Sequence, residues 1–206
     1  TKTMKVAQSL YEAGLISYIR TDSFSISKDA IVNVRDVIKG YGTPYLPSKA
    51  IDYKTKAVNS QEAHECIRPT DLANDGSQID DYDDEKGYKL IKDRFVACQM
   101  SPMIVDVVTY HITTDTKYKL IARGQAIKFD GWFKVYKYSK AKEEVLPDVS
   151  EGESLTLVDI KKTKHSTQAP PRYKDGSLVD QMEKEGVGRP ATWASIIKTL
   201  EDRGYV

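Results

Sequence analysis

A tyrosine, an arginine and several small polar residues stand together in the segment YEAGLISYIRTDS (residues 11–23). Tyr18 is a candidate nucleophile, and Arg20 is a permanent cation two positions later. A phenol has a pKa of about 10, so it reacts slowly at neutral pH unless its anion is stabilised or its proton is taken. A guanidinium can stabilise that anion, or it can hold two oxygens of a phosphate. Taken alone, the segment favours a half-buried strand tyrosine and a polar turn; the next two segments shift the balance toward chemistry.

The second segment with reactive residue types is SQEAHECIRPTD (residues 60–71), which holds His64 between Glu62 and Glu65. Arg68 follows four residues after the histidine, so the two side chains share one face if the segment is helical, and they could then grip a phosphate. A surface helix end with a hydrogen-bonded histidine explains the segment equally well. Zinc binding is disfavoured, because there is no HExxH pattern, no second histidine nearby and no cysteine pair.

The third segment is EGVGRPATWASIIKTLEDRGYV (residues 185–206). Its two glycines allow close backbone approach, Arg189 precedes Pro190 at an expected helix start, and Thr192 falls within the first turn. The helix dipole, free backbone N–H groups, an arginine and a hydroxyl together make an anion site, with a phosphodiester as the natural anion. The alternative is an ordinary helix start after a Gly–Pro turn.

Other parts of a phosphoryl-transfer site are not found in the sequence. Such chemistry usually needs metal ions or several cations to hold the developing charge. The acidic run DDYDDE (residues 80–85) is too dense, and is expected in a loop, so we do not interpret it as a metal site. There is no P-loop and no glycine-rich dinucleotide turn. If the chain takes part in phosphoryl transfer, part of the site is expected to lie elsewhere.

Hydrophobic periodicity predicts helices at both ends of the chain. A period of 3.6 residues, with capping residues and glycine stops, predicts helices over Met4–Ala13, from a Ser27 cap to Gly40, over Lys86–Met100, over Leu178–Glu185 after a Ser177 cap, and over Thr192–Arg203 after Pro190. The segment between the second and third helices begins with a loop that is interrupted twice by proline.

The middle of the chain changes to a period of two. Segments rich in Val, Ile, Tyr and Thr predict strands over Ile104–Thr113, Lys117–Phe129, Trp132–Tyr138 and Ser154–Lys161. The dipeptide Asp130-Gly131 is typical of a hairpin turn. The predicted fold class is therefore α+β and multidomain: a helical domain with the tyrosine, a mostly antiparallel β unit, and the start of a second helical domain.

Composition narrows the class of protein. The chain has 206 residues, 40% hydrophobic and 30% charged, with a net charge of +1, which is enough apolar content for a core but gives no bulk signal for nucleic acid. No stretch approaches the roughly 18 apolar residues of a membrane span. Cys66 and Cys98 form no disulfide framework, so we expect a reduced, cytosolic setting. The first residues do not form a natural start, and we expect an excised fragment.

Charge is distributed unevenly along the chain. Residues 71–88 are strongly acidic, whereas residues 112–142 carry eight lysines and arginines against two aspartates. A basic segment of this kind is usually a solvated face, and it can also line the path of a polyanion.

Four separated motifs, in this order and spacing, resemble the type IA DNA topoisomerases, and the bacterial topoisomerase I branch most. They are GLISYIRTDS, SQEAHECIRPTD, FVACQM and GVGRPATWASIIKTLEDRGYV, and the similarity runs through essentially the whole chain. The β region is less similar apart from FDGW at residues 129–132. Ser17 stands where threonine is common in the family, and this change keeps the hydroxyl.

The resemblance implies a role for individual residues. Tyr18 matches the tyrosine that attacks a single-stranded DNA phosphodiester to give a 5′-phosphotyrosine and a free 3′-hydroxyl, and Arg20 matches the arginine beside the scissile phosphate. The implied DNA- or phosphate-binding residues are His64, Arg189, Thr192, Gln8, Ser17 and Arg68. Another strand passes through the break before it is resealed, so negative supercoils are relaxed without ATP.

The resemblance also implies what lies outside these residues. In the family, Mg²⁺ is bound by acidic residues of an N-terminal TOPRIM domain, which is not part of this sequence, so this chain is expected to bind no metal itself. Residues 1–103 would form the helical domain with the tyrosine, 104–172 the β-rich arch of the gate, and 173–206 the start of a truncated helical DNA-binding domain. We expect a monomer that contacts DNA and the TOPRIM domain, with no membrane contact, in the cytoplasm near the nucleoid.

Three hypotheses follow for the isolated chain. The first is a fragment of a strand-passing enzyme, which is inactive alone because the metal site is elsewhere. The second is a non-catalytic module that binds the DNA backbone, in which Tyr18 packs or stacks. The third is a structural scaffold without a nucleic-acid role, which the basic segment and the Arg189 site make less favourable.

Overall fold

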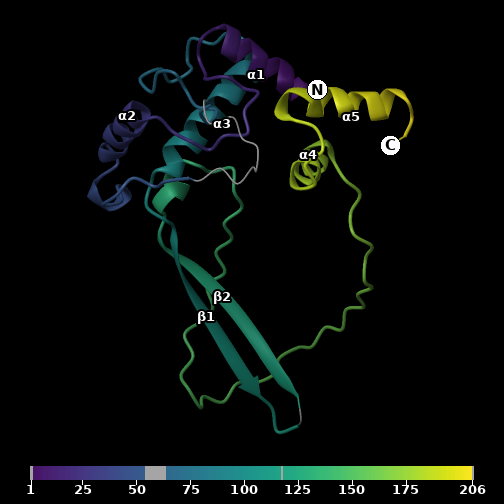
Figure 1. Cartoon of the computed structure of the whole chain (residues 1–206). Coiled ribbons are helices and arrows are strands. Elements are labelled where there is room, and N and C mark those ends of the chain that lie inside the picture. The colour runs from purple at the N-terminus through teal and green to yellow at the C-terminus, as the bar shows by residue number, and fades with distance from the viewer. Residues whose placement is uncertain (1, 54–63, 117, 206) are drawn as a thin grey trace.

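The computed structural model describes residues 2–53, 64–116 and 118–205, and it has an α+β fold (Figure 1). In chain order the elements are α1 (Lys2–Glu12), α2 (Lys28–Lys39), the 3₁₀ turn η1 (Thr43–Tyr45), α3 (Tyr82–Cys98), β1 (Ile104–Thr113), β2 (Lys119–Phe129), the 3₁₀ turn η2 (Gly131–Lys134), α4 (Asp175–Lys184) and α5 (Pro190–Asp202). The predicted α+β fold class and the order helices, strands, helices are confirmed. The predicted domain boundaries stay predictions.

The first two helices begin and end near the predicted residues. After α1 the chain turns at Gly14, whose φ of 71° lies in the left-handed region that glycine adopts without strain. The side chain of Ser27 accepts a hydrogen bond from the Ala30 N–H and caps α2, as predicted. Gly40 follows α2, and its N–H bonds to carbonyls of the last turn. Both helices therefore end where local chemistry satisfies their backbone groups.

Helix α3 begins four residues earlier than predicted, and the acidic run belongs to it. The Asp81 side chain accepts hydrogen bonds from the N–H groups of Asp83 and Asp84, so it caps the helix. Acidic side chains in a first turn are stabilised by the positive end of the helix dipole. The prediction that residues 80–85 form a loop is therefore wrong, because capping and the dipole favour a helix start.

The β region is a two-stranded antiparallel hairpin, which projects away from the helices (Figure 1). Val108 pairs with Gly124 near its middle. The predicted strand over Trp132–Tyr138 is wrong, and Asp130-Gly131 is not a hairpin turn. Gly131 has a φ of 48°, and a side chain there would collide with the Pro102 carbonyl. The chain therefore turns out of β2 directly into η2, where the Phe133 N–H bonds to the Asp130 carbonyl.

A long segment without helix or strand joins η2 to α4. One isolated bridge, between Gln125 and Glu144, places part of it against β2. It then runs from the far end of the hairpin back to α4 (Figure 1). The predicted strand over Ser154–Lys161 is wrong: it has no strand partner among the described residues, and Val158 is 94% exposed. A strand-like pattern forms no strand until a neighbour satisfies its backbone groups.

Helices α4 and α5 pack against one another through small apolar faces. Met182 of α4 and Ile197 of α5 are buried. The N-cap of α4 is Lys174 rather than the predicted Ser177, which lies in the first turn. The Ser177 hydroxyl accepts a hydrogen bond from the Lys174 N–H, 2.8 Å away, so it still satisfies the helix start.

Two hydrophobic clusters form the core of the N-terminal helices. The first joins α2 to the end of α3 and comprises Ala30, Val34, Ile38, Phe95, Val96 and Met100. The second joins α1, the following loop and α3, and comprises Leu10, Ile16, Ile19 and Tyr88. At Gly87 a side chain would collide with Val6, so glycine permits the close approach of α1 and α3. This second cluster lies directly beneath the loop that holds Tyr18.

None of the helices among the described residues combines the length and apolar content that a membrane crossing requires.

Candidate functional site

Tyr18 lies between two buried residues of the loop that follows α1. Ile16 is 1% exposed and Ile19 is 7% exposed, and both belong to the cluster with Leu10 and Tyr88. Tyr18 itself is 40% exposed. The two isoleucines thus fix the backbone on both sides of Tyr18, and the ring stands outside the core. The segment is not a regular strand, although Ile16 forms an isolated bridge with Pro69.

The segment with His64 lies beside the loop that holds Tyr18, and backbone hydrogen bonds join the two. The Ser17 N–H donates to the Arg68 carbonyl at 2.8 Å, and the Thr70 N–H donates to the Leu15 carbonyl at 3.0 Å. The Thr70 hydroxyl donates to the Gly14 carbonyl at 2.7 Å. These bonds run in the antiparallel sense, and they bring together two of the three segments that the sequence singled out.

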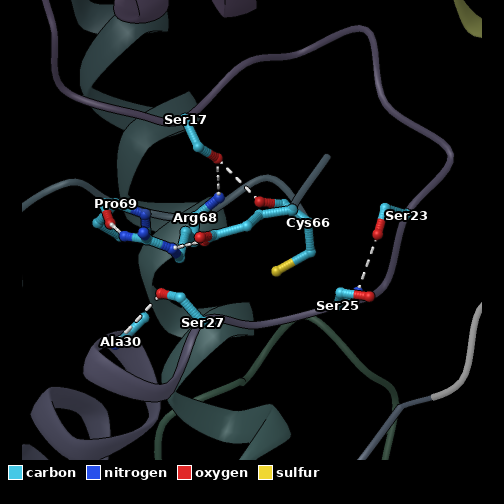
Figure 2. Close-up of polar contacts among 9 residues, drawn as sticks. Ser17, Ser23, Ser25, Ser27, Ala30, Cys66, Arg68 and Pro69 are labelled. Atoms are coloured by element: carbon cyan, nitrogen blue, oxygen red, sulfur yellow. Dashed lines mark hydrogen bonds and ion pairs between the residues drawn. The ribbon is translucent and has the colours of Figure 1, made fainter. Parts of the chain in front are cut away.

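The Ser17 side chain completes this connection (Figure 2). Its hydroxyl donates to the Cys66 carbonyl at 2.8 Å and accepts from the Arg68 N–H at 2.9 Å. We call these two bonds the Ser17 clamp. Ser17, which precedes Tyr18, therefore binds the segment that follows His64. The predicted contact of Ser17 with DNA stays a prediction, and a phosphate would compete with the Cys66 carbonyl for its hydroxyl proton.

The Tyr18 ring has aromatic neighbours on two sides. The Tyr11 ring meets it edge to face, with centroids 5.5 Å apart and planes at 70°. The His64 ring lies with its centroid 5.5 Å from the Tyr18 centroid, at 55°. Such contacts restrict ring motion and contribute about 0.5–1.5 kcal/mol each. Tyr18 and His64 are thus brought together as a pair, from segments far apart in sequence.

His64 and Arg68 do not share a helical face, because the described residues 64–70 form no helix. The Arg68 guanidinium is bound to its own segment: Nε is 2.7 Å from Glu65 Oε2, and the other end donates to the Pro69 carbonyl at 3.0 Å. The prediction that the two residues grip a phosphate from one helix face is therefore wrong. The predicted phosphate contact of Arg68 itself stays a prediction. Burial raises the pKa of the Cys66 thiol in the same segment, and the nearby Arg68 charge offsets only part of that rise.

The start of α5 is built around Gly188, whose φ is 73°. The Thr192 hydroxyl accepts from the Arg189 N–H at 2.9 Å and donates to the Arg189 carbonyl at 3.1 Å. The N–H groups of Thr192 and Trp193 also donate to that carbonyl. Fewer free donors remain than the sequence predicted. Pro190 has no N–H. The Ala191 N–H is a first-turn donor that finds no acceptor in the described part of the chain. The Arg189 side chain at this helix start is exposed, and its predicted binding of an anion stays a prediction.

A groove of about 630 Å³ lies between α1 and the start of α5. Residues of α1, of the Tyr18 loop and of α5 line it: Met4, Lys5, Gln8, Ser9, Glu12, Arg20, Pro190, Ala191, Ala194 and Ser195. Gln8 and Arg20 face this groove as a pair, and Arg189 and Thr192 adjoin it through Pro190. The groove therefore joins the first and third segments, as the Ser17 clamp joins the first and second. Gln8 also donates to Glu12 at 2.7 Å.

Lys5 and Ser195 are among the groove residues that were not predicted from the sequence. Lys5 lies one turn before Gln8 on α1, and Ser195 lies one turn after Thr192 on α5. Residues three apart share a helix face, so this spacing was the available signal. It was not sufficient, because nothing in the sequence indicates that these two helix faces oppose one another. Lys5 adds a second cation to the groove beside Arg20.

The described residues do not supply a metal site: within residues 2–53, 64–116 and 118–205, no three histidine, cysteine or carboxylate side chains gather closely enough to hold an ion. Dissolved Mg²⁺ prefers several oxygen ligands around one point. The described residues therefore do not fit this ion.

Comparison with known proteins gives one consistent result. The family model described as DNA topoisomerase matches residues 1–206. The chain is 46% identical over 209 residues to "DNA topoisomerase 1" of Vibrio cholerae, and 46% identical over 210 residues to the protein of that name from Escherichia coli K12. In each case the alignment covers 100% of this chain and 24% of the relative. The chain thus spans about a quarter of the length of these relatives.

A solved structure agrees with the sequence comparison. Full-length topoisomerase I from Thermotoga maritima superposes with a TM-score of 0.83 and 35% sequence identity, over 98% of this chain and 34% of that one. The resemblance to the type IA enzymes drawn from four motifs is thereby confirmed over the whole chain. On the family match, the identities and the superposition together, this chain belongs to the DNA topoisomerase family.

Proposed function

We propose that this chain supplies the nucleophile and the phosphate-binding groups of a type IA DNA topoisomerase. The observation that supports this best is the convergence of three distant segments: Tyr18 lies against His64, and two residues later Arg20 faces the groove that ends at the start of α5. A scaffold alone would need neither an exposed tyrosine at this point nor cations around the groove.

In the proposed reaction, the Tyr18 hydroxyl oxygen attacks the phosphorus of one phosphodiester in a single strand. A bond forms between that oxygen and phosphorus, and the bond from phosphorus to the 3′-oxygen breaks. The phenol proton is balanced by the proton that the leaving 3′-oxygen gains as a hydroxyl. The number of phosphate ester bonds is unchanged, so resealing is the reverse step and needs no ATP.

Each neighbouring group has a part in this scheme. Arg20 stabilises the charge on the scissile phosphate, where its exposed position leaves the guanidinium available. His64 contacts an adjacent phosphate, and Arg189 holds the strand at the far end of the groove. Lys5 adds to the positive field of the groove. Strand passage through the break then relaxes negative supercoils.

We further propose that Mg²⁺ acts from a TOPRIM domain outside these residues, because the described donors do not fit the ion. The chain alone is then unable to relax supercoiled DNA. The monomeric state, the contact with TOPRIM and a cytoplasmic, nucleoid-associated location stay predictions.

Covalent capture tests the proposal. The chain is joined to its TOPRIM domain, supplied with Mg²⁺ and a 3′-end-labelled single-stranded oligonucleotide, and denatured; we expect label on the protein. Tyr18→Phe removes the label, whereas the matched control Tyr11→Phe keeps it, because Tyr11 only contacts the ring of Tyr18. Undiminished labelling of Tyr18→Phe would refute the assignment of the nucleophile. Strand binding without any labelling in the unmodified protein would favour the alternative, a non-catalytic module that binds the DNA backbone.

A further inference from the structure

A cluster of aromatic side chains lies where η2 follows the hairpin and contacts α3, and none of its members lines the groove. It consists of Phe133, Tyr136 and Tyr138, and we call it the aromatic strip. Tyr136 and Tyr138 have ring centroids 5.0 Å apart, with planes at 54°. Tyr138 is 54% exposed. Trp132 precedes the strip and packs against the first core cluster, so it anchors this segment to the helices.

Phe133 and Tyr136 contact the Trp132 ring, but Tyr138 is not needed to fill the core. Phe133 and Tyr136 are half-buried, and Tyr138 leaves most of its ring in water although buried apolar area would stabilise the fold by about 25 cal/mol per Å². Tyr138 is thus an exposed ring next to two half-buried ones and several cations. The occupant must therefore be one that uses aromatic faces.

Cations accompany the rings. The Lys137 Nζ lies 4.1 Å from the Phe133 ring centroid, and the Arg94 guanidinium of α3 lies 5.3 Å from that of Tyr136. Lys134 and Lys140 are exposed in the same segment. An apolar protein partner would have to dehydrate these charges, whereas a polyanion would pair with them.

The two nearby carboxylates already have partners. Asp93 accepts a hydrogen bond from the Tyr138 hydroxyl at 3.2 Å. Asp130 accepts one from the Tyr45 hydroxyl at 2.7 Å, and it lies 4.0 Å from the Lys134 ammonium. The positive groups therefore outnumber the negative ones at the strip.

We propose that the aromatic strip binds a segment of single-stranded DNA, with a base stacked on the exposed Tyr138 ring and phosphates paired with Arg94 and the neighbouring lysines. Rings combined with cations are the usual means of binding a strand without reading its sequence. This proposal rests on the proposed function, and it adds a second contact with the DNA strand at the base of the hairpin. A base stacked on an exposed ring keeps its position when the strand in the groove is cut, so the strip can hold DNA during strand passage.

Binding of a fluorescent oligothymidylate to the 206-residue chain, with an abasic strand of equal length as comparison, tests the stacking. We expect Tyr138→Ala to weaken oligothymidylate binding about tenfold, equivalent to about 1.4 kcal/mol, and to leave the abasic strand's affinity unchanged. Tyr138→Phe keeps the ring and loses the bond to Asp93, so it binds like the unmodified chain. The matched control is Tyr82→Ala, since Tyr82 is 64% exposed and has Lys86 over its ring at 4.2 Å, but stands in the acidic start of α3.

Photocrosslinking separates this proposal from the proposed function. An oligonucleotide with 5-iododeoxyuridine is crosslinked and the attached residues are identified by mass spectrometry; we expect attachment within the aromatic strip. Crosslinks confined to the groove and the Tyr18 region, or equal affinities of Tyr138→Ala and the unmodified chain, would refute the strip and leave the proposed function standing. Absence of binding and of crosslinks anywhere on the chain would refute both.

Discussion

Removal of the Ser17 hydroxyl tests whether the clamp holds the two halves of the tyrosine site together. Ser17→Ala deletes both bonds, to the Cys66 carbonyl at 2.8 Å and from the Arg68 N–H at 2.9 Å. A net hydrogen bond is worth about 1 kcal/mol, and a partner left unsatisfied costs about 1–3 kcal/mol if it is buried. Both groups are only partly buried, so water recovers some of this cost. We therefore expect a loss of about 2 kcal/mol, or roughly 30-fold in the local opening equilibrium.

Amide hydrogen exchange is the appropriate assay, because the chain has separate packed parts and a single unfolding midpoint need not describe the loop. The Arg68 N–H should exchange roughly 30-fold faster in Ser17→Ala, while amides in the middle of α3 change little. Ser17→Thr keeps the hydroxyl and serves as the matched control, with exchange close to that of the unmodified chain. Unchanged exchange at Arg68 in Ser17→Ala would show that the backbone bond from Ser17 to Arg68 and the core beneath hold the loops without the clamp.

Two further predictions concern a glycine and a thiol. Gly188→Ala should destabilise the start of α5 by about 2 kcal/mol in urea unfolding, because a positive φ costs about 1–2 kcal/mol and the added carbon would also press on Ile196. The control is Gly186→Ala, which has a positive φ but open space around it and should lose less stability. Equal losses in the two variants would contradict the packing argument. Burial raises the pKa of the Cys98 thiol to about 11. At pH 8 the Cys98 thiol should therefore react with iodoacetamide roughly 100-fold more slowly than an ordinary thiol, and the reaction should accelerate as the pH rises toward 11. Fast labelling of Cys98 in the folded chain at pH 8 would disprove this burial.

The sequence predicted those features of the fold that depend on local chemistry. The Ser27 cap of α2 and the glycine after α1 were found because capping and left-handed turns require particular residue types. The strand over Ser154–Lys161 was predicted from an equally clear pattern, and it failed because a strand also needs a neighbour to pair with. The turn at Gly131 was misassigned for a related reason: its conformation depends on contact with Pro102, which no local pattern reveals.

The candidate site also has residues that local sequence identifies and residues that only the fold brings together. Tyr18 and Arg20 were identified because a nucleophile beside a cation is recognisable wherever it lies in a chain. The clamp was not predicted, because the Ser17 hydroxyl finds its partners, Cys66 and Arg68, about 50 residues away. Likewise, Lys5 lines the groove only because the start of α5 lies opposite α1. Residue chemistry is local, but the choice of partner is set by the fold.

The positions of the buried and hydrogen-bonded groups explain how an exposed tyrosine can be held accurately. Tyr18 pairs with no strand in the part of the chain that the structure describes, so an isolated loop would leave its ring mobile. Burial of Ile16 and Ile19 fixes the backbone on both sides, and the Ser17 clamp ties that backbone to the segment that follows His64. The ring then needs only edge contacts, which leave its hydroxyl free to approach a strand. The sequence neighbours of Tyr18 therefore fix its position, and the exposure of its own side chain leaves the hydroxyl accessible to a DNA strand.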